Sequence, residues 1–122
     1  MNREHLSQIY EAWESNRRGV LVCETALRCV INEDLRQELT DFLKRMRHRE
    51  QILRGVFEEL QLDPDEQTPR TAAVRHRDLS LVRAMEQALN NGDPVTAQLV
   101  AVECVIEAGL RQDEAAEQNQ AA

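Results

Sequence analysis

The chain has 122 residues, of which 42% are hydrophobic and 30% charged, and this composition is that of an ordinary globular domain. Its net charge of −7 at pH 7 argues against sequence-independent binding to nucleic acid or to an anionic membrane surface. Three prolines and four glycines leave little to interrupt the chain, which favours long helices over strands.

The first half of the chain predicts two long helices, over residues 3–31 and 33–62. Asn2 is suited to cap the first helix, and Asn32 or Asp34 is suited to cap the second. In the first, apolar residues recur every seven positions. The second carries a comparable apolar stripe and ends before Pro64, because proline disfavours helical geometry in the preceding residue. The expected core positions of these two helices are Leu6, Ile9, Trp13, Val20, Cys23, Leu27, Val30, Leu35, Leu39, Phe42, Met46, Leu53, Val56 and Leu60.

The second half predicts a loop over residues 63–70 and two shorter helices, over 71–90 and 94–114. Asn91-Gly92 is a typical helix stop, and Asp93-Pro94 is a typical helix start. We expect residues 1–114 to form the folded domain and residues 115–122 to be a disordered tail.

These elements predict an all-α fold, an antiparallel four-helix bundle of up-down-up-down topology. The short connections favour antiparallel neighbours, and an extended or coiled-coil arrangement is the alternative.

The order of the elements resembles the ferritin-like family, in particular its small bacterial domains, whose metal ligands are degenerate. The resemblance covers residues 6–110. Its carriers are Asp34-Leu35, the segments 48–53 and 57–60, His76-Arg77 and the segment 91–94.

The resemblance implies a metal site of carboxylates and Glu-x-x-His pairs, and the sequence lacks those pairs. Arg45 stands three residues before His48, and Ile106 stands three residues after Glu103. We therefore expect a protein without catalysis or cofactor, in which the metal site has been lost. The alternative is a di-metal oxidoreductase or iron-binding protein with an unorthodox site, built from Glu24, His48, Glu50 and Glu103.

Polar residues also fall on the predicted core stripes near the middle of the bundle. Antiparallel pairing about residues 32 and 33 brings Asn16 level with Arg49, and Arg17 close to Glu50, while Glu103 lies on the stripe of the last helix. Buried charges need partners, so these five residues predict a paired polar layer in the core. The layer has three interpretations: packing specificity, a relic metal site or a small-ligand pocket.

Two segments carry more apolar residues than one buried face requires. Residues 99–106 are apolar nearly all round, and residues 20–31 have a similar surplus. We expect a homodimer, with a further protein partner unknown, through Leu21, Val22, Val100 and Val105. Alternatively, these faces pack against the long loop and neighbouring helices.

Cys23, Cys29 and Cys104 are odd in number and lack a Cys-x-x-Cys spacing, which is typical of a reducing compartment. The segment 1–5 is too polar for a signal peptide, and no apolar run reaches the ~20 residues of a membrane span. We therefore expect a cytoplasmic protein that binds neither nucleic acid nor membrane. Thiol chemistry at Cys23 or Cys104 is a further alternative.

Overall fold

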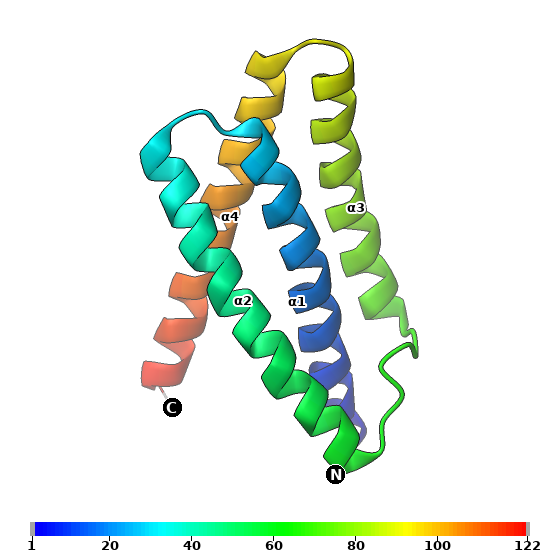
Figure 1. The fold of residues 1–122 in the computed structure, drawn as a ribbon. Helices are drawn as coiled ribbons and strands as arrows, with labels where there is room; N and C mark the ends of the chain where they lie inside the picture. The colour runs from blue at the N-terminus through cyan, green and yellow to red at the C-terminus, as the bar shows by residue number, and fades with distance from the viewer. Residues whose placement is uncertain (1, 122) are drawn as a thin grey trace.

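The computed structural model describes residues 2–121, with side chains described for residues 2–107. Over this part, the chain forms four α-helices and no strand, which confirms the predicted all-helical class (Figure 1). The helices are α1 (Arg3–Cys29), α2 (Glu33–Leu60), α3 (Pro69–Asn90) and α4 (Pro94–Ala121).

The caps at the helix starts follow the sequence closely. The side chain of Asn2 accepts a hydrogen bond from the His5 N–H at 2.9 Å, and Asn32 accepts one from Leu35 at 3.1 Å, as predicted. Helix α3 begins earlier than the predicted residue 71. Thr68 and Thr71 exchange side chain-to-backbone bonds there in a reciprocal cap, with Pro69 in the first turn.

The helix ends explain the remaining differences in length. Helix α2 ends at Leu60 because Gln61 takes left-handed geometry, with φ of 55°. Gly92 adopts the predicted left-handed geometry after α3, with φ of 69°. Helix α4 continues past residue 114 to Ala121, and the alanine, glutamate and glutamine of this segment are strong helix formers. The domain boundary at residue 114 stays a prediction.

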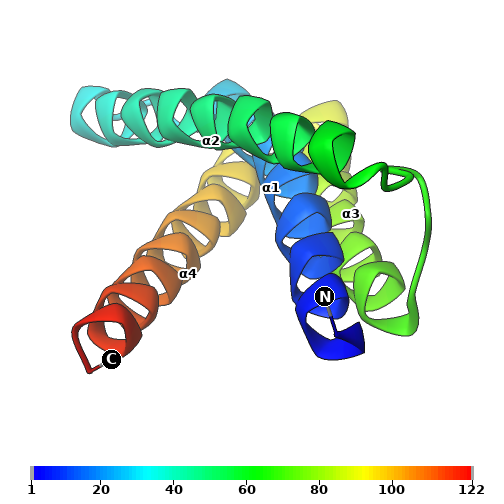
Figure 2. The same cartoon turned by 90° about the horizontal axis from the view of Figure 1, so that it is seen from below.

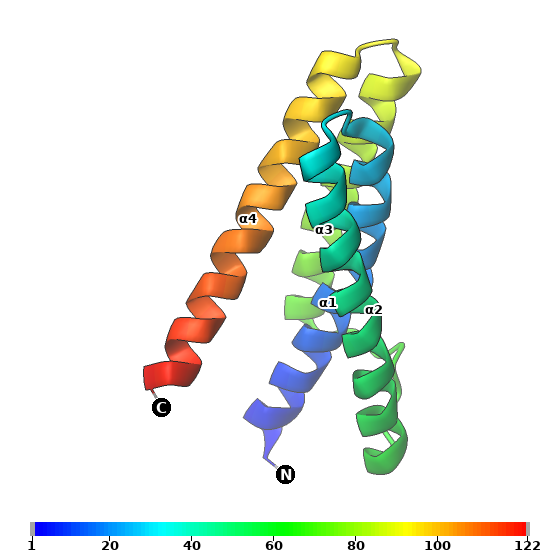
Figure 3. The same cartoon turned by 60° about the vertical axis from the view of Figure 1, so that its left-hand side comes forward.

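Helix α1 lies at the centre of the molecule and packs against all three other helices (Figures 1 and 2). Helix α3 packs on both α1 and α4, whereas the extensive contacts of α2, among the residues described, are with α1 alone. The second half of α4 runs away from α1 and α2 (Figures 2 and 3). The four helices therefore do not close into a ring in which α2 also packs on α3.

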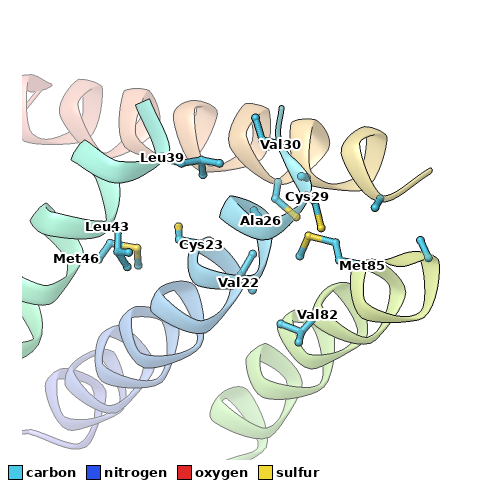
Figure 4. Packing of buried hydrophobic residues seen from close by; sticks show 14 residues of the cluster. Val22, Cys23, Ala26, Cys29, Val30, Leu39, Leu43, Met46, Val82 and Met85 are labelled. Atoms are coloured by element: carbon cyan, nitrogen blue, oxygen red, sulfur yellow. The ribbon is translucent and has the colours of Figure 1, made fainter. Parts of the chain in front are cut away.

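The main hydrophobic core lies where α1 meets the other three helices (Figure 4). Met85 of α3 and Ala26 of α1 are completely buried at its centre. The fully buried residues that helix α4 contributes to this core are small, and partly buried Val100 and Val105 pack against it. The buried members are Val22, Cys23, Ala26, Cys29, Val30, Leu39, Leu43, Met46, Val82, Met85, Ala88, Ala97, Ala101 and Cys104.

A second, aromatic cluster lies at the other end of α1 and is made by Tyr10, Trp13 and Phe57. The Trp13 and Phe57 rings meet nearly edge to face, with centroids 5.1 Å apart. Trp13 Nε1 donates to the carbonyl oxygen of Pro64 at 3.0 Å, and the Tyr10 hydroxyl donates to Glu66 at 3.0 Å. These bonds hold the loop between α2 and α3 against α1. Burial and the Glu66 carboxylate raise the pKa of Tyr10.

Candidate functional site

The predicted paired polar layer is wrong, because the structure buries only Asn16 of its five residues, whose side chains are all described, and no hydrogen bond or ion pair joins any of the five to another. Asn16 is buried, and its Nδ2 donates to the backbone carbonyl of Met46 at 2.8 Å. Arg17 is partly exposed, lies over the Trp13 ring and pairs with Asp65 of the loop at 3.6 Å. The remaining three lie on or near the surface: Arg49 and Glu103 are exposed, and Glu50 pairs with Arg54 at 3.2 Å.

A shift of one residue on α2 explains why Arg49 is outside. The sequence placed Phe42, Arg49 and Val56 on the core stripe, seven residues apart. In the structure the line that meets α1 passes through Leu43 and Phe57, which are also fourteen residues apart but one position later. A heptad pattern fits both lines, so apolar spacing alone does not choose between them.

On α4 the same reasoning selected the wrong side of the helix. The buried line is made of Ala97, Ala101 and Cys104, small residues that carry a weak hydrophobic signal. Glu103 lies with Leu99 and Ile106 on the outside. Large apolar residues are normally the better indicator of a buried face, and here they mark the exposed one.

The buried charge of the molecule lies instead at the contact of α1 with α3. Glu14 is 3% exposed, and its carboxylate accepts bonds from Arg75 Nε at 2.9 Å and Nη2 at 3.3 Å. Arg18, one turn along α1, donates to the same carboxylate at 2.8 Å. Burial disfavours the charged form, but the hydrogen bonds and charges of the two arginines outweigh it and hold the pKa of Glu14 below its ordinary value.

Sequence reasoning missed this triad, although part of its signal was visible. Glu14 and Arg18 have the i,i+4 spacing of a helical ion pair, which is usually a surface feature. Arg75 lies 61 residues from Glu14, and no local pattern connects the two. A second buried carboxylate, Asp78 of α3, accepts a bond from the adjacent Arg77 at 3.1 Å and was also missed, because its burial depends on how α3 packs.

The residues of the alternative metal site do not come together. Glu24 pairs with Arg47 at 3.2 Å, and Glu50 pairs with Arg54. His48 and Glu103 are both exposed, on different helices. Among the residues whose side chains are described, no three histidine, cysteine or acidic side chains are grouped so that they could hold a metal ion.

The four residues predicted for the interface belong to the core instead. Val22 is buried, and Leu21, Val100 and Val105 are partly buried and packed against the main cluster. The prediction assumed that apolar residues outside the core stripe would be exposed. In the structure, α1 packs against the three other helices and α4 against α1 and α3, so these residues are covered as well. The exposed apolar residues of α4 are others: Val95, Leu99 and Ile106, which are 69%, 61% and 57% exposed.

These residues form a continuous line, which we call the outer face of α4, with half-buried Val102 between Leu99 and Ile106. Their spacing of four, three and four residues is that of one helix face. At 100° per residue this face lies opposite the buried line of Ala97, Ala101 and Cys104. Helix α4 is therefore apolar on two opposite sides, and the bundle covers one of them.

A different surface, which we call the basic face of α2, is formed by Lys44, Arg45, His48 and Arg49. These four side chains are exposed and neighbour one another along one side of the helix. The guanidinium of Arg45 lies over the Phe42 ring, 5.7 Å from its centroid. None of the four forms an ion pair within the part of the chain whose side chains are described.

Comparison of the chain with protein-family models, curated proteins and solved structures gave no match. None of the described helices is both long enough and apolar enough to cross a membrane.

The three cysteines all lie in the main core, two on α1 and one on α4. Burial raises the pKa of Cys29, against the opposing effect of the nearby Arg28 charge. A raised pKa disfavours the thiolate, which is the nucleophilic form. The alternative of thiol chemistry concerned Cys23 and Cys104, and both side chains are buried in the same core.

Proposed function

We propose that the protein is a non-catalytic helical bundle of the ferritin-like kind that works by association with a second copy of itself, through the outer face of α4. The single observation that carries the proposal is the exposure of Val95, Leu99 and Ile106 on one line of a helix whose opposite line is already buried. Contiguous exposed apolar surface of this kind typically marks an interaction site.

The physical driving force is the removal of these side chains from water. Fully burying a valine, leucine or isoleucine side chain contributes about 1.5–3 kcal/mol relative to leaving it exposed. Three such residues in each chain would offset a substantial part of the cost of bringing two molecules together. Ile31 extends the apolar surface, because it is 73% exposed and its N–H donates to Gln98 of α4 at 3.1 Å.

The ferritin-like part of the proposal includes helices that alternate in direction, and it is supported by the connections. Residues 30–32 join α1 to α2, and residues 91–93 join α3 to α4, so each pair has room only for a tight reversal. The buried carboxylate supports a structural role, since Glu14 is already bonded to Arg75 and Arg18 and holds α1 to α3.

The test is the molecular mass in solution as a function of concentration, by analytical ultracentrifugation. We expect the wild-type protein to reach twice the mass of one chain and the Leu99→Asp variant to stay at one. Leu60→Asp is a matched control, because Leu60 is also exposed, at 40%, but lies at the end of α2. A wild-type protein that is monomeric at high concentration, or a Leu99→Asp variant that still dimerises, would overturn the proposal.

A further inference from the structure

We infer that the outer face of α4 docks on the basic face of α2 in the second copy, so that the association is between unlike surfaces. The inference rests on the proposed function and names the surface that receives α4. The apolar line on α4 accounts for the existence of an interface. Charge complementarity determines which surface of the second copy the outer face of α4 contacts.

The α4 side of this contact is acidic at its edge. Between Pro94 and Glu107 the sequence contains only two charged residues, Glu103 and Glu107, and both are acids. Glu103 is exposed and lies within four residues of both Leu99 and Ile106. A helix with this face therefore presents apolar side chains bordered by negative charge.

The α2 side has the opposite character. Residues 44–49 contain four of the fifteen basic residues of the chain and no acid. Arg47 points toward α1 and pairs with Glu24, whereas Lys44, Arg45 and Arg49 stand on the outside without ion pairs among the residues whose side chains are described. Elsewhere arginines are widely paired, as in Arg17 with Asp65 and Arg70 with Glu11.

The basic face also has an apolar contact to offer. Ile52 is 54% exposed and lies three and four residues after Arg49 and His48, on the same side of α2. An apolar line with an acidic border would thus meet an exposed isoleucine with a basic border. Beyond this segment the same side of α2 also carries acids, namely Asp34, Asp41 and Glu59, and the Asp41 carboxylate accepts a bond from Gln37 at 3.0 Å.

Self-pairing of either surface is electrostatically less favourable. Two α4 outer faces would bring Glu103 of one chain toward Glu103 of the other. Two basic faces would bring Lys44, Arg45 and Arg49 of one chain toward the same three residues of the other. Like charges placed across an interface oppose association, whereas unlike charges speed it and select the partner. In a closed two-fold pair, each chain gives its α4 to the partner and receives the partner's α4, so the contact forms twice.

The sign of the salt dependence distinguishes these pairings. Contact between α4 and α2 should weaken as sodium chloride is raised from roughly 0.05 M to roughly 0.5 M, because screening removes attraction between unlike charges. Contact between two α4 faces should strengthen over the same range, because screening removes repulsion. Association that strengthens with salt would overturn the inference.

Charge reversal on α2 is the second test of this docking. The double variant Arg45→Glu with Arg49→Glu should raise the dimer dissociation constant at least about tenfold at low salt, since it places acids against Glu103. Adding Glu103→Arg to that double variant should recover a large part of the affinity. The matched control is Arg3→Glu with Arg83→Glu, two exposed arginines on α1 and α3, which should leave the constant unchanged. Far-UV circular dichroism checks that each variant is folded.

The outcomes separate this inference from the proposed function. If Leu99→Asp abolishes the dimer while the α2 charge reversal leaves it intact, association through α4 stands and docking on α2 is wrong. If Leu99→Asp has no effect, both are wrong. Loss of the dimer in both variants, with recovery on adding Glu103→Arg, supports both.

Discussion

Glu14 of α1 and Arg75 of α3 form a two-bond ion pair, with Nε 2.9 Å and Nη2 3.3 Å from the two carboxylate oxygens. The carboxylate is almost fully buried, while the side chains of Arg75 and Arg18 are 26% and 21% exposed. The pair therefore crosses the main helix contact of the molecule with its negative end inside and its positive ends reaching water. The triad of Glu14, Arg18 and Arg75 therefore holds α1 against α3.

Replacing Glu14 by glutamine should destabilise the protein by about 2–3 kcal/mol. Removing one partner of a fully buried pair costs about 3–5 kcal/mol, and the partial exposure of the arginines lowers that figure. Urea unfolding followed by circular dichroism measures the change. Glu11→Gln serves as the control, because Glu11 pairs with Arg70 on the surface and should cost less than about 1 kcal/mol. Equal effects of the two substitutions would contradict the role given to Glu14.

The same carboxylate predicts how stability responds to acid. The pKa of Glu14 in the folded protein lies below its ordinary value of 4.5, so the folded state binds fewer protons than the unfolded state near that pH. Its contribution to stability is therefore complete above that value and is lost as the pH falls through the lowered pKa. We expect the difference in unfolding free energy between wild type and Glu14→Gln to be constant near neutrality and to shrink below pH 4.5. Comparing the two proteins separates this effect from the lowered pKa of Asp93, which both retain. If the difference in unfolding free energy instead grew on acidification, the lowered pKa of Glu14 would be contradicted.

Asn16 predicts a contrast between two substitutions at one buried position. Its Nδ2 donates to the carbonyl of Met46, which already has a place in the hydrogen bonds of α2. Asn16→Ala should therefore cost only about 1 kcal/mol. Asn16→Asp, of nearly the same shape, puts a buried carboxylate against a carbonyl oxygen and should cost several kcal/mol more at neutral pH. Thermal unfolding of both variants is the measurement, and similar melting temperatures would show that Asn16 is not bonded as described.

Neighbouring residues on α4 predict opposite phenotypes. Val100 packs against the main core, whereas Leu99 is 61% exposed. Val100→Asp should lower the stability of the single chain by several kcal/mol, because it buries an unpaired charge. Leu99→Asp should leave that stability nearly unchanged and alter only the mass in solution. Unfolding in urea at low protein concentration, where association is minimal, tests the first half of this contrast.

The sequence predicted the local structure well, because local chemistry determines it. Asn2, Asn32 and Gly92 act at the helix ends as expected, and these effects require only a few neighbouring residues. The buried faces depend on which helices meet, and there the sequence was less informative. On α2 the apolar residues fit two possible core lines that are one residue apart, and the line through Leu43 is the one that is buried.

The candidate sites depended even more on long-range contacts. The surplus of apolar residues on α4 was recognised, but its residues were misassigned, since alanines fill the contact with the bundle and large side chains point outward. The pairing of Glu14 with Arg75 could not be found from spacing, because it requires the position of α3 against α1. The ferritin-like assignment stays a prediction.

Because the two hydrophobic clusters are separate, the unfolding of each can be followed by its own signal, one by fluorescence and the other by thiol modification. Its only tryptophan and only tyrosine both lie in the aromatic cluster, so intrinsic fluorescence follows that end of α1. Its three thiols all lie in the main core, so their modification by a thiol reagent follows the other end. If the two signals are lost together on denaturation, α1 transmits cooperativity along its whole length. If the fluorescence changes first, the loop end opens as a unit of its own while the main core stays closed.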